Sequence, residues 1–285
     1  MQETVLTLGH SPDPDDAFMF YGLARGLLPS PGLRFEHILQ DIQTLNERAV
    51  RGELDISAIS FAAFPKVCSQ YALLPSGASM GDGYGPLVVA RHRYERAELA
   101  RLRLAIPGTL TSAFLALQLF LERSAAELDY LVVPFDQIFD ALAQGRAEAG
   151  LLIHEGQLTY ARGGWEVCVD LGRWWAETQD GLPLPLGGNV IHKRHSEELR
   201  RQVARILTDS IRYSLEHRSE ALSYALQFGR GLDRDLADRF VGMYVNHWTL
   251  DYGPRGREAI RRFLGLAHQR GYLPHAPELD FVAAG

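Results

Sequence analysis

Residues 85–91 read Gly-Pro-Leu-Val-Val-Ala-Arg, and residues 187–193 read Gly-Gly-Asn-Val-Ile-His-Lys. Both stretches start at a glycine and continue with β-branched residues, which favours extended backbone. We interpret them as two paired strands that cross between two lobes and form a hinge. This interpretation predicts a larger lobe from residues 1–90 plus 192–285, a smaller lobe from residues 91–191, and a cleft between them.

Short apolar runs alternate with amphipathic stretches up to Ser196, which is the pattern of successive βα units. The predicted strands are residues 5–8, 33–38, 56–59, 87–90, 104–106, 130–133, 149–153 and 167–171. The predicted helices start near Asp15, cover residues 44–51, follow Thr111 and cover residues 135–143. Beyond Ser196, apolar residues at helical spacing predict a long helix and three further helical segments, followed by a Pro-rich tail.

The chain has 285 residues, of which 46% are hydrophobic, so one large domain or two α/β lobes are possible. Its net charge is −6, and no basic stretch is longer than residues 193–195, so we expect no nucleic-acid partner. No apolar run is long enough to span a membrane, and the first residues lack a signal-peptide pattern. We therefore expect no membrane partner and a cytoplasmic location. Nothing in these patterns specifies an oligomeric state.

A weak internal repeat points to one end of each predicted sheet. Residues 49–60 and 143–154 both contain a helix end, a glycine, an acidic residue and an apolar strand. The two strands end in Ser60 and His154, and ligands of parallel sheets bind beyond the carboxyl ends of strands. Imidazole is well suited to proton transfer near neutral pH, so His154 is a candidate general base. A hydrogen-bonded structural histidine fits this position equally well.

Two turns combine polar residues with a helix start. In residues 10–20, free backbone amides could hold a ligand carboxylate unless Asp15 or Asp16 caps the helix instead. In the second turn, Thr111 and Ser112 could donate to an oxyanion, or they could act as ordinary helix caps. The spacing of the aspartates does not fit a calcium loop, and no histidine pair has zinc-ligand spacing, so we predict no metal.

Nucleotide-binding and serine-hydrolase motifs are missing from the sequence, which predicts no nucleotide cofactor. Several other segments are distinctive in combination. They are the Ser-Pro-x-Pro-x-Asp-x-Phe turn from Ser11, residues 41–46, 85–91, 152–155 with 159–160, 170–175 and 181–187. In this order they resemble the 1,4-dihydroxy-6-naphthoate synthase family of the futalosine route to menaquinone, and the similarity covers nearly the whole chain.

The resemblance implies a fold of the α/β class, similar to the type II periplasmic-binding proteins, in which two lobes each contain a mixed sheet flanked by helices. It also implies a cofactor-free carbon–carbon lyase that converts cyclic dehypoxanthine futalosine, a small acidic substrate, to 1,4-dihydroxy-6-naphthoate. The family's proposed base corresponds to His154. The implied substrate-binding residues are Ala58, Ile59, Ser60, Thr111, Ser112, Asn46 and Ser11.

The first turn departs from the family pattern, which commonly reads Ser-Pro-Cys-Pro-Asn-Asp. Asp13 and Asp15 replace the cysteine and the asparagine, which adds negative charge near the expected site of an acidic substrate. Two alternative functions use the same scaffold. One is the chorismate dehydratase of the same pathway, and the Ile-His-Glu segment at His154 favours the synthase over it. The other is a non-catalytic solute-binding protein for a small carboxylate, which would require export.

Overall fold

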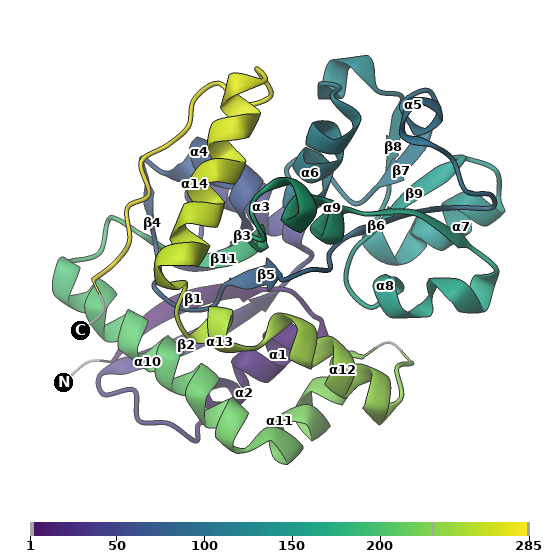
Figure 1. Cartoon of the computed structure of the whole chain (residues 1–285). Helices are drawn as coiled ribbons and strands as arrows, with labels where there is room; N and C mark the ends of the chain where they lie inside the picture. Colours follow the sequence, from purple (N-terminus) through teal and green to yellow (C-terminus); the bar gives the residue numbers. More distant parts are fainter. Residues whose placement is uncertain (1–2, 230, 284–285) are drawn as a thin grey trace.

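The computed structural model describes residues 3–229 and 231–283, which form two mixed β-sheets flanked by helices (Figure 1). The first sheet has the order β2-β1-β3-β11-β4, and β5 also pairs with β11. Its strands are β1 (Thr4–His10), β2 (Leu33–Leu39), β3 (Ile56–Ser60), β4 (Tyr71–Leu73), β5 (Ser79–Gly81) and β11 (Leu184–His192). The second sheet has the order β10-β6-β9-β7-β8. Its strands are β6 (Leu87–Ala90), β7 (Leu104–Ile106), β8 (Tyr130–Val132), β9 (Ala149–Leu152) and β10 (Glu166–Asp170).

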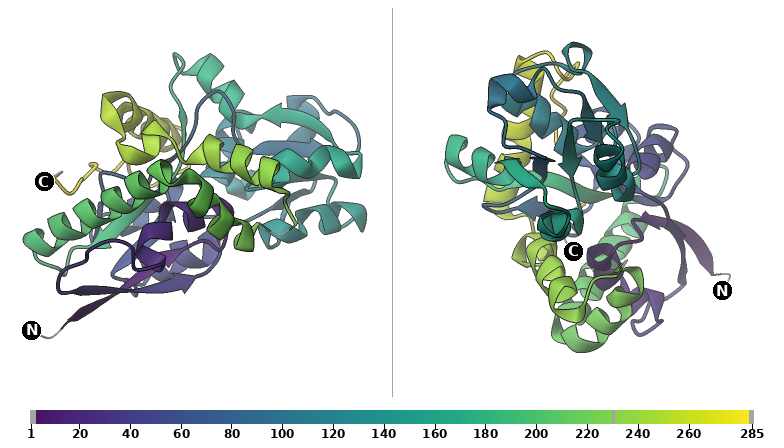
Figure 2. Two further views of the ribbon diagram at one scale, coloured as in Figure 1. Left: turned by 90° about the horizontal axis from the view of Figure 1, so that it is seen from below. Right: turned by 90° about the vertical axis from the view of Figure 1, so that its right-hand side faces the viewer.

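The helices are divided between the two lobes, and those from residue 197 onward belong to the larger lobe (Figures 1 and 2). In the first half of the chain they are α1 (Pro14–Met19), α2 (Tyr21–Ala24), α3 (Ile42–Val50), α4 (Phe64–Val67), α5 (Arg96–Leu99), α6 (Ser112–Leu121) and α7 (Ile138–Ala143). In the second half they are α8 (Gly156–Thr159), α9 (Leu171–Thr178), α10 (Glu197–Glu216), α11 (Arg218–Ala225), α12 (Arg234–Tyr244), α13 (His247–Leu250) and α14 (Gly253–Gln269). The first strand and the C-terminal segment up to residue 283 both belong to the larger lobe, away from the second sheet (Figure 1).

The predicted two-lobed α/β fold is confirmed, and each of the eight predicted strands overlaps an observed one. The predicted pairing of the two crossing strands is wrong, because β6 pairs with β9 and β10 whereas β11 pairs with β3, β4 and β5. Strand pairing therefore assigns residues 87–90 to the smaller lobe and residues 184–192 to the larger one. Hydrophobic pattern identifies a strand, but the partner that supplies its hydrogen bonds depends on the tertiary fold.

The chain passes from the second sheet back to the first through α9, which packs against the larger lobe. The indole of Trp175 is fully buried, lies 5.4 Å between ring centroids from Phe263 of α14, and donates from Nε1 to the Pro183 carbonyl at 3.1 Å. The predicted C-terminal tail also clasps the larger lobe. The Val282 amide donates to the Leu73 carbonyl at 2.8 Å.

Two chain segments touch where α9 begins, and we expect this contact to be sensitive to a single methyl group. A Cβ atom on Gly172 would lie 1.8 Å from the backbone oxygen of Tyr84. Gly172→Ala is therefore expected to lower the free energy of unfolding by about 1–3 kcal/mol, measured by urea unfolding. Gly265→Ala is the matched control, because a Cβ there meets no atom within 4 Å and the position is inside α14. It should raise the free energy of unfolding by about 0.5–1 kcal/mol. Equal stabilities for the two variants would contradict the packing argument.

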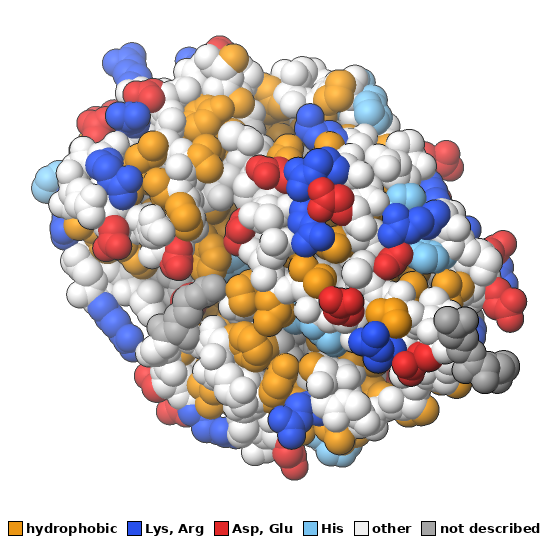
Figure 3. All heavy atoms as spheres, turned by 180° about the vertical axis from the view of Figure 1, so that it is seen from behind, with side chains coloured by type: hydrophobic (Ala, Val, Ile, Leu, Met, Phe, Trp, Pro, Cys, Tyr) orange, Lys and Arg blue, Asp and Glu red, His pale blue; other side chains and the backbone are white. Residues whose placement is uncertain are grey.

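Charges of both signs are interspersed on the face of the molecule seen in Figure 3, where Lys and Arg side chains lie next to Asp and Glu side chains. Several of these charges form ion pairs, for example Arg262 with Asp180 at 2.6 Å. Such pairs are exposed and contribute little to stability. Within residues 3–229 and 231–283, every helix is too short or too polar to cross a membrane.

Candidate active site

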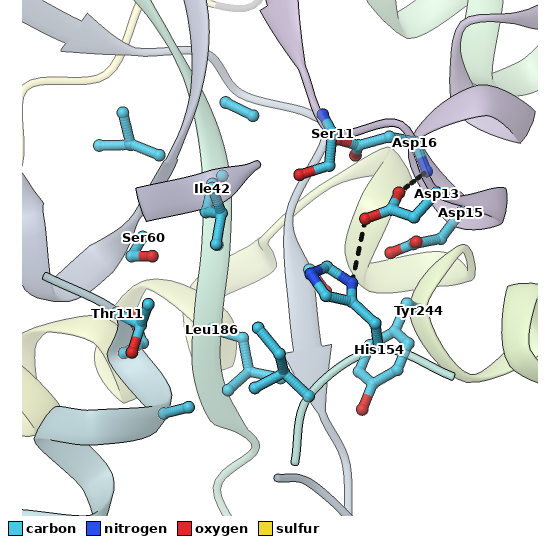
Figure 4. Close-up of a pocket in the computed structure, with 18 of the residues that line it drawn as sticks. Ser11, Asp13, Asp15, Asp16, Ile42, Ser60, Thr111, His154, Leu186 and Tyr244 are labelled. Atoms are coloured by element: carbon cyan, nitrogen blue, oxygen red, sulfur yellow. Dashed lines mark hydrogen bonds and ion pairs between the residues drawn. The ribbon is translucent and has the colours of Figure 1, made fainter. Parts of the chain in front are cut away.

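A cavity lies between the two lobes and receives side chains from both. The larger lobe contributes the ends of β1 and β3, the middle of β11, and α12, while the smaller lobe contributes the start of α6 and the turn after β9. The walls between the polar groups are apolar and include Ile42 and Leu186 (Figure 4).

The cavity brings together almost all of the residues predicted from the sequence. Those that line it are Ser11, Ala58, Ile59, Ser60, Thr111, Ser112 and His154. Asn46 is fully buried behind the wall and is not among the lining residues. Its Oδ1 atom accepts from the Ser60 amide at 2.8 Å, and its Nδ2 atom donates to the Ser60 hydroxyl at 3.0 Å. Asn46 thus holds the end of β3 in place.

Hydroxyl groups gather at one end of the cavity, where α6 of the smaller lobe approaches β3. The Ser112 hydroxyl accepts from the Ala62 amide at 3.1 Å, which links the lobes. The Thr111 hydroxyl is already used, because it caps α6 through the Phe114 amide and donates to the Gly108 carbonyl. The Ser60 and Ser112 hydroxyls each accept one bond, so their own protons can point to a ligand.

Asp13 immediately before α1, with Asp15 and Asp16 in the first turn of α1, occupies the opposite end of the cavity (Figure 4). Asp13, and not Asp15 or Asp16, is the N-cap of α1, and its Oδ1 atom accepts from the Asp16 amide at 3.3 Å. The Asp16 carboxylate accepts from the Ser11 amide at 2.6 Å. Two of the backbone amides that could have bound a ligand carboxylate, those of Ser11 and Asp16, are therefore bonded to side-chain carboxylates of the chain itself.

His154 projects from the smaller lobe toward these aspartates (Figure 4). Its Nδ1 atom lies 3.0 Å from Oδ2 of Asp13, and the Phe135 ring lies 4.5 Å from the imidazole between centroids. His154 has a φ of 54°, in the left-handed region that few non-glycine residues adopt. Among the described residues, no partner satisfies its buried Nε2 atom. The imidazole is thus held at Nδ1 and offers Nε2 to the cavity.

Burial and mutual proximity shift the pKa values of this cluster apart. Burial alone would lower the pKa of His154, but the charge and hydrogen bond of Asp13 outweigh it and raise the pKa. Burial alone would raise the pKa of Asp13, but His154 lowers it below its usual value. Burial and the neighbouring carboxylates raise the pKa of Asp15 well above its usual range and that of Asp16 to about 8. Such divergent values are typical of proton-transfer sites.

The raised pKa of Asp16 makes folding stability depend on pH. A carboxyl whose pKa rises from 3.8 to about 8 on folding stabilises the protein fully only below the lower value, and this contribution is lost as pH rises through the higher one. Asp16→Asn cannot ionise at this position. We therefore expect the melting temperature of Asp16→Asn, minus that of the wild type, to increase as the pH rises from 5 to 9. Thermal unfolding at several pH values measures this gain. A difference that does not change with pH would contradict the assigned pKa.

The same cluster contains ligand types that divalent cations use. One atom each of Asp13, Asp15 and His154 lies within 4.8 Å of the others. The spacing of the aspartates within the turn predicted no metal site. That spacing gave no indication that His154 would join them from the other lobe. The predicted absence of a metal stays a prediction, and the turnover of the wild-type protein in the presence of a chelator tests it.

Several lining residues were not predicted as site residues, and the polar ones among them include Asp13, Gln157, Asn189 and Tyr244. In the sequence, Asp13 was distinctive only as a departure from the family pattern. The added negative charge was the one feature that could have identified Asp13 as a partner of a candidate base. Tyr244 of α12 donates to Gln157 of the smaller lobe at 2.8 Å, so the C-terminal helices close one side of the cavity. No local motif marks these two residues, because their contact joins distant segments.

Two lobes with mixed sheets, and a polar cavity lined from both, define a protein of the periplasmic-binding-protein-like class. The alkanesulfonate-binding protein of Xanthomonas axonopodis pv. citri has the same fold, with a TM-score of 0.69 at 13% identity over 99% of this chain and 97% of that one. The particular family follows from the sequence. The chain belongs to the menaquinone biosynthesis family, whose sequence model matches residues 6–269.

Two curated relatives are named 1,4-dihydroxy-6-naphthoate synthase. The protein from Thermus thermophilus is 39% identical over 97% of this chain and 99% of its own length, and the one from Streptomyces coelicolor is 34% identical over 96% of both. A crystal structure of an Archaeoglobus fulgidus protein superposes with a TM-score of 0.89 at 40% identity, covering 94% of this chain and 98% of that one. These relatives make the chain a member of an enzyme family of menaquinone biosynthesis.

Proposed function

We propose that this protein is a 1,4-dihydroxy-6-naphthoate synthase, a carbon–carbon lyase that acts on cyclic dehypoxanthine futalosine and requires neither a metal nor an organic cofactor. The observation that carries the proposal is the Asp13–His154 pair, which presents a buried, unpartnered Nε2 atom to the cavity. The synthase names of relatives that match nearly the full length support the same reaction. A cytoplasmic location stays a prediction.

The two ends of the cavity suit two parts of such a substrate. The hydroxyls of Ser60 and Ser112 can donate to a carboxylate, whereas the ionised carboxylate of Asp13 would repel one. The substrate carboxylate therefore binds at the hydroxyl end, the ring system lies along the apolar wall, and the sugar-derived part lies beside His154. This orientation puts the bonds that break next to the imidazole.

In this arrangement neutral His154 accepts a substrate proton at Nε2, because its Nδ1 proton is donated to Asp13. The electron pair released in the substrate can drive ring opening and carbon–carbon cleavage toward an aromatic naphthalene diol. Aromatisation makes the overall change favourable, so positioning and one base are the main demands on the protein. Asp13 is a positioning residue in this mechanism, since it acts on the substrate through His154.

The direct test is to incubate the purified protein with cyclic dehypoxanthine futalosine and to identify the products by mass spectrometry. We expect 1,4-dihydroxy-6-naphthoate and a three-carbon fragment, with turnover that persists after treatment with a chelator. Binding of the substrate without turnover would instead support a solute-binding role. Conversion of chorismate in place of the futalosine derivative would identify the dehydratase of the same pathway.

A further inference from the structure

Three buried polar atoms that line the cavity make no hydrogen bond within the described part of the chain. They are Oδ1 of Asp15, Nε2 of His154 and Oδ1 of Asn189. Buried polar atoms are rarely left unpaired, because they lose their bonds to water without replacement. An unpaired atom that faces a cavity therefore indicates which hydrogen-bonding group the ligand supplies: an unpaired acceptor indicates a ligand donor, and an unpaired donor indicates a ligand acceptor.

Asp15 needs a donor. Its side chain is only 7% exposed, and one of its carboxyl oxygens lies within 4.8 Å of a carboxyl oxygen of Asp13. Two buried carboxyl groups this close together are stable only if one of them carries a proton. Asp13 is paired with His154 and caps α1, both of which favour its ionised form, so the proton resides on Asp15. The free Oδ1 atom of Asp15 is then the acceptor of a neutral carboxylic acid.

Asn189 needs a donor as well, and it lies outside the acidic cluster. Its side chain is 2% exposed on β11, and its Nδ2 atom donates to the carbonyl oxygen of Gly77 at 3.4 Å. Reversing the amide would set two carbonyl oxygens against each other. A Cβ atom on Gly77 would lie 2.1 Å from Nδ2, so the amide is also packed tightly on that side. Oδ1 of Asn189 is therefore the atom left without a partner.

We propose that the cavity contains a subsite for the hydroxyl groups of the sugar-derived part of the ligand, with Asp15 and Asn189 as the acceptors that select them. The inference rests on the proposed function, which places that part of the substrate beside His154. One ligand-type atom of Asp15 lies within 4.8 Å of one of His154, and both side chains line the same part of the cavity, so the part of the substrate beside His154 can also contact Asp15 (Figure 4). A neutral acid and an amide suit hydroxyl donors better than they suit a cation.

The test compares two ligands by isothermal titration calorimetry in a His154→Asn background, which prevents turnover. Cyclic dehypoxanthine futalosine carries the hydroxyl groups, and naphthalene-2-carboxylate carries the ring and carboxylate without them. Asp15→Ala is expected to weaken the first ligand by about tenfold to a hundredfold and the second by less than about threefold. Asp15→Asn keeps a side-chain oxygen as acceptor, so it should restore binding of the futalosine derivative to within about threefold of the background.

Three outcomes would overturn the subsite. Equal weakening of both ligands would mean that Asp15 only shapes the cavity, and unchanged affinity for both would mean that its oxygen contacts no hydroxyl. Turnover by the wild-type protein, which keeps all three candidate ligands, that disappears with a chelator and returns with Mn²⁺ would assign the cluster to a metal. If Asp15→Ala does not fold, Asn189→Ala provides the same comparison with the same expected selectivity.

Failure of the proposed function gives a different result from failure of the subsite. A background protein that binds naphthalene-2-carboxylate but no futalosine derivative would reject the proposed substrate, and the subsite with it. A background protein that binds both, and whose Asp15→Ala and Asn189→Ala variants show no selective loss, would reject the subsite alone.

Discussion

Replacing His154 by asparagine is expected to lower kcat by about 10²–10⁴-fold, the usual contribution of a positioned general base. Nε2 of His154 is the imidazole nitrogen that faces the cavity without a partner among the described residues. Asparagine tolerates the φ of 54° better than most residues do, so the turn should keep its shape. Its amide cannot accept the substrate proton. Substrate binding should persist, because the contacts at Ser60 and Ser112 are unchanged.

The measurement is the rate of naphthoate formation at saturating substrate, together with the melting temperature of the variant. His37→Asn is the matched control, because His37 is hydrogen-bonded to His10 at 2.9 Å and is not among the residues that line the cavity. It should keep kcat within about twofold of the wild type. Turnover by His154→Asn at close to the wild-type rate would assign the base to another residue.

The pH dependence of the wild-type enzyme should report the same group. Only neutral His154 can accept a proton, and the neutral form predominates above its pKa. Because Asp13 raises that pKa from 6.5, kcat/KM is expected to fall with decreasing pH at a midpoint above 6.5. A profile that is flat between pH 6 and pH 9 would contradict this assignment.

The sequence alone was enough to predict the parts of the site that lie at strand ends. Ser60 and His154 follow β3 and β9, and the apolar runs that predict these strands are fully buried in the structure. Local pattern is informative there because each strand needs a continuous apolar stretch to be buried on both faces. The α6 start at Thr111 was predictable for a similar reason, since Ser and Thr are common helix caps.

Other parts of the site depend on how the two lobes meet, and no local pattern specifies that. Asp13 and His154 belong to different lobes, as do Tyr244 and Gln157, so each pair exists only when the lobes are close together. The strands β4 and β5 were missed because three residues show little periodicity and, unlike β7 and β8, they are not separated by a helix in an alternating βα pattern. The partners of β6 and β11 were also out of reach, because two extended stretches can pair with each other or with separate sheets.

Asp13→Asn is expected to lower kcat by about 10²–10⁴-fold at every pH, although it removes no group that contacts the substrate. In the wild type, Oδ1 of Asp13 accepts from the Asp16 amide and Oδ2 faces Nδ1 of His154. The oxygen of an asparagine would keep the bond to the Asp16 amide, so its NH₂ group would face the imidazole. Nδ1 would then have to accept, and the ring proton would move to Nε2, where it blocks proton transfer from the substrate.

Asp13 could act on His154 by fixing its tautomer or only through its negative charge. Measuring kcat across pH distinguishes these two effects. Loss of the Asp13 charge should lower the pKa of His154, so charge alone predicts an acid limb displaced to lower pH with turnover retained at high pH. The tautomer argument predicts low turnover throughout, because the neutral ring carries its proton on the wrong nitrogen. It also predicts that Asp13→Ala keeps more activity than Asp13→Asn, since alanine leaves the ring free to adopt either tautomer. If the Asp13→Asn enzyme recovers the wild-type kcat at high pH, the effect of Asp13 on turnover is due to its charge alone.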